Sequence, residues 1–243
     1  MTEADRLRAM LRGHRRLIDT AQEMAGTHLA EHGGYVAWSG GKDSTIVAEL
    51  AHRANPDTPI VTYVAGTEYP EVLPFCAQLA LERGWNWEPI QTGDITVLLD
   101  RGGIPADDGE WWDIMIAGPA RVAHERHGLG LLWGMRGTES RARAAQLYST
   151  RGIHTRKTDG VTTCAPLWRW TTDDVYAAHR ALGLPLCPTY EVMERIGMPR
   201  EQRRVGRVIG RRNMADRLHW LRLGWPELHS EYTTRWPWLE QLD

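Results

Sequence analysis

Residues 35–45 read YVAWSGGKDST: an apolar run, a glycine turn and the start of a helical pattern. The run at residues 35–38 predicts a short buried strand, and the apolar positions from Ile46 to Ala51 repeat at helical spacing. The two glycines permit close backbone approach, and successive N–H groups at the start of a helix attract anions. The stretch therefore predicts a phosphate-binding loop between a strand and its helix.

The side chains of this loop suit a nucleotide. Lys42 adds a cation, and Asp43 is a candidate magnesium ligand. The Walker A pattern does not fit, because it needs glycine at Val36 and serine or threonine at Asp43. An ordinary glycine turn capped by serine remains the alternative. We expect the phosphates to be bound by Ser39, Gly40, Gly41, Lys42, Asp43, Ser44 and Thr45.

Strand and helix patterns alternate on both sides of the loop. The patterns predict strands at residues 35–38, 60–64, 87–90 and 129–133, helices at 3–30, 44–54, 70–83, 112–127 and 172–182, and a loop at 93–109. Such alternation favours parallel strands with helices on both faces of the sheet. We therefore expect a Rossmann-like three-layer α/β fold with a mostly parallel central sheet and a helical C-terminal segment.

Composition narrows the class of protein. The 243 residues carry a net charge of −2, with 42% hydrophobic and 25% charged residues, values typical of a globular chain. We expect a cytoplasmic protein without membrane contact, because no apolar run is long enough for a span and the N-terminus lacks a signal-peptide core. The three cysteines form no CxxC pair, which argues against a disulfide framework or a thiolate metal site.

Four segments resemble, in order, those of the phosphoadenylyl sulfate (PAPS) reductase-like branch of the adenine nucleotide alpha-hydrolase superfamily, the PP-loop ATP pyrophosphatases. SGGKDST at residues 39–45 is the signature of that superfamily. The other three are GTEYPE at residues 66–71, LWGMRGTESR at 132–141, and PLWRWT with DVY within 166–176. The resemblance covers roughly residues 33 to 200, and it implies an adenine nucleotide alpha-hydrolase-like fold that binds an adenine nucleotide.

Several residues outside the loop are candidates for the site. Arg136, Arg141 and Arg143 follow the fourth predicted strand, and the arginine fork suits phosphate or sulfate. Glu139 could orient one of these three arginines, although a solvated charged turn is the alternative. With Lys42 and Asp43, Arg136 and Arg141 are the candidate catalytic residues. The resemblance adds Gly66, Thr67, Gly134 and Glu139 as nucleotide-binding positions.

The sequence departs from the reductases in its thiols. Those enzymes attack the sulfonucleotide with a cysteine near the C-terminus, whereas no cysteine follows Cys187 here. The cysteine pairs that bind an iron–sulfur cluster in related reductases are also missing, so we expect no cluster. Cys164 is a candidate for handling sulfur, but a buried structural thiol is the more common role.

The leading hypothesis is an enzyme that binds ATP and magnesium and cleaves between the alpha and beta phosphates. Cleavage would adenylate an acceptor for sulfur transfer, with a nucleic acid or a small metabolite as the acceptor. A cysteine desulfurase or a thioredoxin-like protein would supply the sulfur or a thiol. Two alternatives stay open: a PAPS reductase or sulfotransfer enzyme that uses a partner's thiol, and a nucleotide-binding regulator without turnover.

The chain divides into three predicted parts: an N-terminal helix at residues 1–32, a nucleotide-binding α/β domain at 33–190, and an arginine-rich helical segment at 191–243 packed on that domain. From Arg195 to Arg222 there are nine arginines and two acidic residues, Glu201 and Asp216. This excess predicts either a surface for nucleic acid or a solvated helix face.

Overall fold

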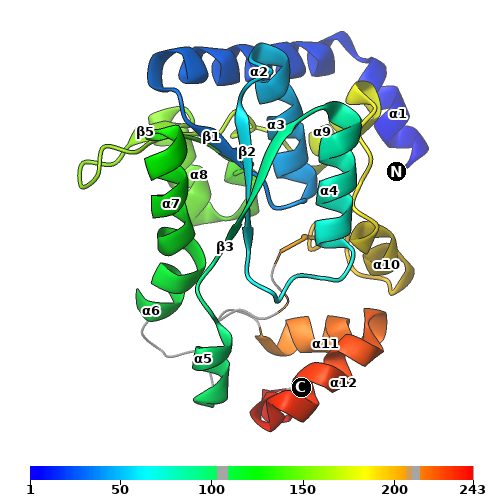
Figure 1. The fold of residues 1–243 in the computed structure, drawn as a ribbon. Coiled ribbons are helices and arrows are strands. Elements are labelled where there is room, and N and C mark those ends of the chain that lie inside the picture. Colours follow the sequence, from blue (N-terminus) through cyan, green and yellow to red (C-terminus); the bar gives the residue numbers. More distant parts are fainter. Residues whose placement is uncertain (103–108, 207, 209–213, 243) are drawn as a thin grey trace.

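A computed structural model describes residues 1–102, 109–206, 208 and 214–242 (Figure 1). Its centre is a six-stranded sheet of order β3-β2-β1-β4-β6-β5. All neighbouring strands are parallel except β5 and β6. The strands are β1 (Tyr35–Ala37), β2 (Pro59–Val64), β3 (Asn86–Gln91), β4 (Gly130–Leu132), β5 (Ile153–Thr155) and β6 (Thr162–Cys164).

Alternate residues of the strands face opposite layers, which makes the fold three-layered. Val36 and Leu132 belong to the larger core, which also contains residues of α2 (Arg12–His32), α3 (Lys42–Ala54), α4 (Val72–Arg83) and α9 (Thr172–Leu182). Tyr35 and Leu131 belong to a smaller core with Ala123 of α7 (Gly118–His127) on the other face. The predicted α/β fold with a mostly parallel sheet is confirmed.

The remaining helices lie around this frame. They are α1 (Glu3–Met10), α5 (Thr96–Asp100), α6 (Gly109–Trp112), the π-helix η1 (Asp113–Ala117), the 3₁₀ turn η2 (Gly137–Glu139), α8 (Arg141–Thr150), α10 (Thr189–Arg195), α11 (Met214–Gly224), α12 (Pro226–Arg235) and the 3₁₀ segment η3 (Pro237–Leu242).

Three predicted elements differ in detail. The helix expected at residues 3–30 breaks at Leu11, whose extended backbone lets α1 pack on α9 while α2 packs on α3. The helix expected at 112–127 contains η1 ahead of Pro119, which lacks an N–H group for the α-helical bond. The loop expected at 93–109 contains α5, and its residues 103–108 lie outside the described part.

The C-terminal helices pack against loops at the carboxyl ends of the strands, below the sheet in Figure 1. The Trp225 indole donates to Glu71 at 2.8 Å, and the Trp236 indole donates to Asp100 at 2.7 Å. The C-terminal helices therefore border the edge of the sheet where the predicted nucleotide loop lies. Among the residues described, no helix has the length and apolar character needed to cross a bilayer.

Candidate nucleotide-binding site

The topology brings two predicted motifs to one point. β1 lies between β2 and β4, so the order in which strands are added to the sheet reverses beside the loop that follows β1, where open α/β sheets bind ligands. The turn after β4 passes directly against the start of α3. A Cβ atom on Gly134 would lie 2.6 Å from the backbone nitrogen of Ser44, so this approach requires glycine.

The loop between β1 and α3 is held from within. Gly40 has a φ of +70°, a conformation that favours glycine. The Ser44 hydroxyl donates to the Gly41 carbonyl at 3.2 Å, and Thr45 accepts the Trp38 indole N–H at 2.9 Å. Ser44 and Thr45 are both buried, and their hydroxyl groups hold the loop in shape through these bonds. Ser39 is exposed at the loop surface.

Three charged side chains meet at the first turn of α3, and we call them the loop cluster: Lys42, Asp43 and Arg136. Lys42 Nζ lies 2.9 Å from Asp43 Oδ2, and Arg136 Nε lies 2.6 Å from Asp43 Oδ1. The Lys42 and Arg136 side chains are only 2% and 4% exposed, so water screens them little.

The charges of the loop cluster do not balance. Burial would raise the pKa of the Asp43 carboxyl, but the Lys42 ammonium and the Arg136 guanidinium outweigh it and lower that pKa. Asp43 is therefore ionised at neutral pH, and two cations share one carboxylate. The first turn of α3 adds its partial positive charge, since no side chain caps the helix at Gly41. The arrangement fits an anion.

Three residues that the sequence analysis gave no role position the loop. The Lys42 backbone N–H donates to the Tyr190 hydroxyl at 2.9 Å. His179 Nε2 lies 2.8 Å from the Lys42 carbonyl, and because burial lowers its pKa the ring is neutral and donates there. Lys42 Nζ also donates to the Arg203 carbonyl at 3.3 Å. Two segments of the sequence signal two of them, because residues 188–190 resemble a Pro-x-Tyr segment and residues 202–203 a Gln-Arg motif of related proteins.

Other candidates lie apart from the loop cluster. Arg141 begins α8 as an exposed residue, and the structure gives it no contact with Lys42, Asp43 or Arg136. Glu139 contacts Arg143 and lies 4.0 Å from Arg204. Of the three arginines expected near Glu139, the one that it contacts is Arg143, which helical spacing places one turn away.

The motif after β2 offers one open polar group. Gly66 turns the chain with a φ of +73°. The Thr67 carbonyl accepts the Val208 N–H at 2.7 Å. The buried hydroxyl of Thr67 has no hydrogen-bond partner within the described ranges. Buried polar groups usually have partners, so this hydroxyl is suited to a polar atom of a ligand.

The cysteines do not form a thiol site. All three are unpaired and buried. Cys164 is fully buried at the end of β6, and burial raises its pKa to about 12. A thiol in this state is inert, because the thiolate is the reactive form. The burial of Cys164 favours the structural role over the handling of sulfur, the two roles that the sequence left open.

Magnesium does not fit Asp43 as the side chains are arranged. Both carboxylate oxygens of Asp43 already contact cations. Within the described residues, no group of three or more Asp, Glu, His or Cys side chains is positioned to hold a metal ion. A divalent cation beside two buried cations would also be repelled. The predicted metal role of Asp43 is thus unsupported.

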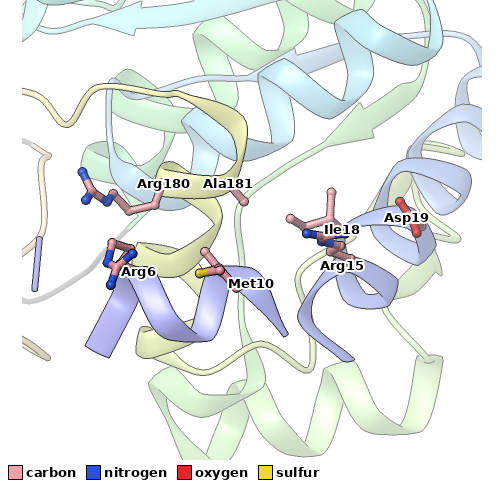
Figure 2. A pocket seen from close by; sticks show the side chains of 8 residues that line it. Arg6, Met10, Arg15, Ile18, Asp19, Arg180 and Ala181 are labelled. Carbon is pink, nitrogen blue, oxygen red and sulfur yellow. The ribbon is translucent and has the colours of Figure 1, made fainter. Parts of the chain in front are cut away.

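A groove of about 490 Å³ lies elsewhere, between α1, α2 and α9 (Figure 2). Arg6 and Met10 line it from α1, Arg15 and Ile18 from α2, and Arg180 from α9. None of the residues predicted to bind the nucleotide lines this groove. The candidate site thus rests on the convergence of charges at the sheet edge.

Comparison with known families agrees with this geometry. Residues 34–203 match the family described as the phosphoadenosine phosphosulfate reductase domain. The match spans more than half of the chain, so the protein belongs to that family. A search of curated proteins finds no match.

Solved structures share the fold at low identity. A PAPS reductase from Candida auris in a phosphate complex is 14% identical, covers 74% of this chain and 90% of its own, and gives a TM-score of 0.57. A Candida glabrata FMN adenylyltransferase bound to FMN and the ATP analogue AMPCPP is 10% identical, with coverage of 77% and 65% and a TM-score of 0.55. At these identities the likeness shows the fold alone.

Proposed function

We propose that this protein binds ATP at the loop after β1 and cleaves it between the alpha and beta phosphates, which adenylates an acceptor. The observation that carries the proposal is the loop cluster, in which two buried cations share one carboxylate at a helix N-terminus. A pyrophosphate leaving group develops negative charge at that point. Prearranged donors stabilise such charge without reorganising when the reaction occurs.

The roles of the residues follow from their positions. Lys42 and Arg136 would neutralise the leaving phosphates, and Asp43 would hold both side chains in place before the nucleotide binds. His179 and Tyr190 fix the Lys42 backbone from the carbonyl and the amide side. The open hydroxyl of Thr67 would contact the nucleoside or its alpha phosphate. Asp43 would hold no metal ion in these roles, because both of its carboxylate oxygens contact the Lys42 and Arg136 side chains.

Sulfur transfer would be the use of the adenylated acceptor, and the sulfur would come from another protein. The cysteines favour this division of labour, since all three are buried and unable to carry a persulfide to the site.

Binding of a sulfonucleotide is the second candidate function. The family match favours it, because the matched family is named for PAPS reduction. The thiols oppose it: burial raises the pKa of Cys76 and Cys164 to about 12 and also raises that of Cys187. A reductase would therefore need its thiol from a partner.

Calorimetric titration separates these functions. Wild-type protein is titrated with AMPCPP and, separately, with adenosine 3′,5′-bisphosphate. We expect the triphosphate analogue to bind more tightly, and ATP to release pyrophosphate when an acceptor is supplied. Tighter binding of the bisphosphate would reject adenylation in favour of the sulfonucleotide. Binding of AMPCPP with no pyrophosphate release across acceptors would favour a regulator without turnover.

A further inference from the structure

Residues 141–169 are strongly basic, and the structure describes all of them. The segment contains one acidic residue, Asp159, and six basic ones: Arg141, Arg143, Arg151, Arg156, Lys157 and Arg169. Arg143 contacts Glu139 and Arg156 contacts Asp159. The other four form no ion pair with a described residue and are exposed, so their charges face solvent.

We call the exposed side chains of this segment the 141–169 surface. α8 ends at Thr150 with Arg151 as its C-cap, and β5 begins two residues after Arg151. The hairpin that joins β5 to β6 carries Arg156 and Lys157 and projects beyond α8 in Figure 1. A Cβ atom on Gly152 would lie 2.7 Å from the Trp168 ring, so the turn that carries Arg169 packs against the end of α8.

Exposed aromatic groups are interleaved with these charges. Tyr148 is 52% exposed, and its ring meets the Trp168 ring edge-on with 5.1 Å between centroids. The Arg169 guanidinium lies 4.1 Å from the centroid of the Trp168 ring. Aromatic rings and arginine planes beside a basic track are the groups that bind unpaired bases and their phosphates.

The 141–169 surface is joined to the candidate site. The Gly137 N–H donates to the Trp168 carbonyl at 2.9 Å, and Arg136 Nη1 donates to the Trp170 carbonyl at 3.2 Å. A Cβ atom on Gly137 would lie 2.8 Å from the Tyr148 ring. Tyr148 therefore packs directly on the residue that follows Arg136 of the loop cluster.

We propose that the 141–169 surface binds single-stranded nucleic acid, with an unpaired base stacked on Tyr148 and phosphates held by Arg151, Lys157 and Arg169. A polymer fits better than a single phosphate, because the unpaired charges extend from α8 to the hairpin. The further statement that the bound nucleic acid also carries the acceptor group rests on the proposed function. The other basic segment, between Arg195 and Arg222, can be compared only in part, because residues 207 and 209–213 lie outside the described residues.

Fluorescence anisotropy with labelled 20-nucleotide single strands of mixed sequence tests the charges. The RNA and DNA forms are measured separately from 50 to 200 mM salt. We expect Arg151→Gln/Lys157→Gln/Arg169→Gln to weaken binding about 10–100-fold and to reduce the salt slope by about 2. The matched control, Arg12→Gln/Arg15→Gln/Arg16→Gln, removes the same charge from exposed positions on α2. Equal losses in both variants would overturn the proposal.

Tyr148 provides a test that net charge does not affect. We expect Tyr148→Ala to weaken single-strand binding about 5–100-fold with an unchanged salt slope, and Tyr148→Phe to restore it. Binding of a duplex as tightly as a single strand, or an unchanged affinity in Tyr148→Ala, would reject stacking. Melting curves of each variant ensure that the comparison is made on folded protein.

The two proposals fail separately. Lys42→Ala should keep wild-type affinity for the single strand, because Lys42 is buried away from the 141–169 surface. Strand binding without any release of pyrophosphate would reject adenylation and leave the surface intact. Pyrophosphate release by a protein that binds neither labelled strand would reject the surface alone.

Discussion

Two clusters of charged side chains in this molecule have opposite balances. The loop cluster has two cations for one carboxylate. The other, which we call the N-terminal cluster, joins α1, α9 and residue 200 through Asp5, Arg8, Asp173, Asp174 and Arg200. It has two arginines for three aspartates and so needs no further anion. The difference indicates which buried charges serve the fold and which await a ligand.

Asp5 and Asp174 also serve as helix caps, which marks the N-terminal cluster as structural. The Asp5 carboxylate accepts the Thr2 N–H in a capping box and contacts Arg200 at 2.5 Å. Asp174 does the same for Thr171 and contacts Arg8 at 2.7 Å. In the loop cluster, Gly41 gives no side-chain cap, and the amide groups of the first turn face the charges instead.

The largest effect should come from Lys42→Ala. We expect pyrophosphate release to fall about 10²–10³-fold, because one prearranged cation opposite the leaving group is lost. The melting temperature should change little, since Asp43 keeps Arg136 as its partner. The matched control, Arg8→Ala, removes a cation from the N-terminal cluster and should leave turnover within about threefold of wild type. Equal losses of turnover in both variants would remove the distinction between the clusters.

Asp5→Asn should give the reverse pattern. Asp5 is 2% exposed and Arg200 is 24% exposed, so the variant leaves a half-buried cation with one weaker partner, Asp173. We expect a loss of about 2 kcal/mol in the free energy of unfolding. For a chain of this size that corresponds to a fall of about 4–8 °C in melting temperature. Turnover per folded molecule should stay near that of wild type, as measured beside a urea unfolding curve.

The sequence contains enough local information to predict the loop but too little to predict these pairings. Residues 39–45 lie between a buried strand and a helix, and both are specified by their own apolar spacing. Asp5 and Arg200 are 195 positions apart, so only the folded chain shows that they meet. The partner of Glu139 could not be chosen for a related reason: three arginines lie within reach in the sequence, and only the geometry of the folded chain selects Arg143.

The missed strands have a similar physical cause. β5 and β6 are three residues long and rich in threonine, so neither carries a hydrophobic period that a scan along the chain would detect. They form because β6 pairs with β4 and β5 then covers the open edge. The 141–169 surface depends on this pairing, which explains why charge counting selected the segment from Arg195 to Arg222 instead.

A smaller effect should appear in the dependence of stability on pH. Burial would raise the pKa of Asp5, but its hydrogen bonds to Arg200 and Thr2 lower it below the ordinary value. The folded state thus binds fewer protons at this group, so its stabilising contribution is present above about pH 4 and is lost as the pH falls further. Urea unfolding at pH 7, 5, 4 and 3 should show the wild-type and Asp5→Asn curves converging below about pH 4. Subtracting the stability of Asp5→Asn from that of wild type at each pH removes the contribution of groups that both proteins share. One such group is His28, whose pKa is lowered to about 4 by burial.

The smallest expected effect distinguishes the two roles of Asp43. If Asp43 is only a counter-ion for Lys42 and Arg136, its removal should not change how magnesium affects nucleotide binding. The ratio of AMPCPP affinities with and without magnesium should then be the same in wild type and Asp43→Asn. Affinity for inorganic pyrophosphate without metal should stay the same or rise, since a negative charge beside the anion is removed. As a magnesium ligand, Asp43 would instead give a ratio that falls to about one in the variant. That result would mean that nucleotide binding breaks the ion pairs of Asp43 with Lys42 and Arg136. Magnesium binding by Asp43, and not the excess positive charge of the free protein, would then explain the site.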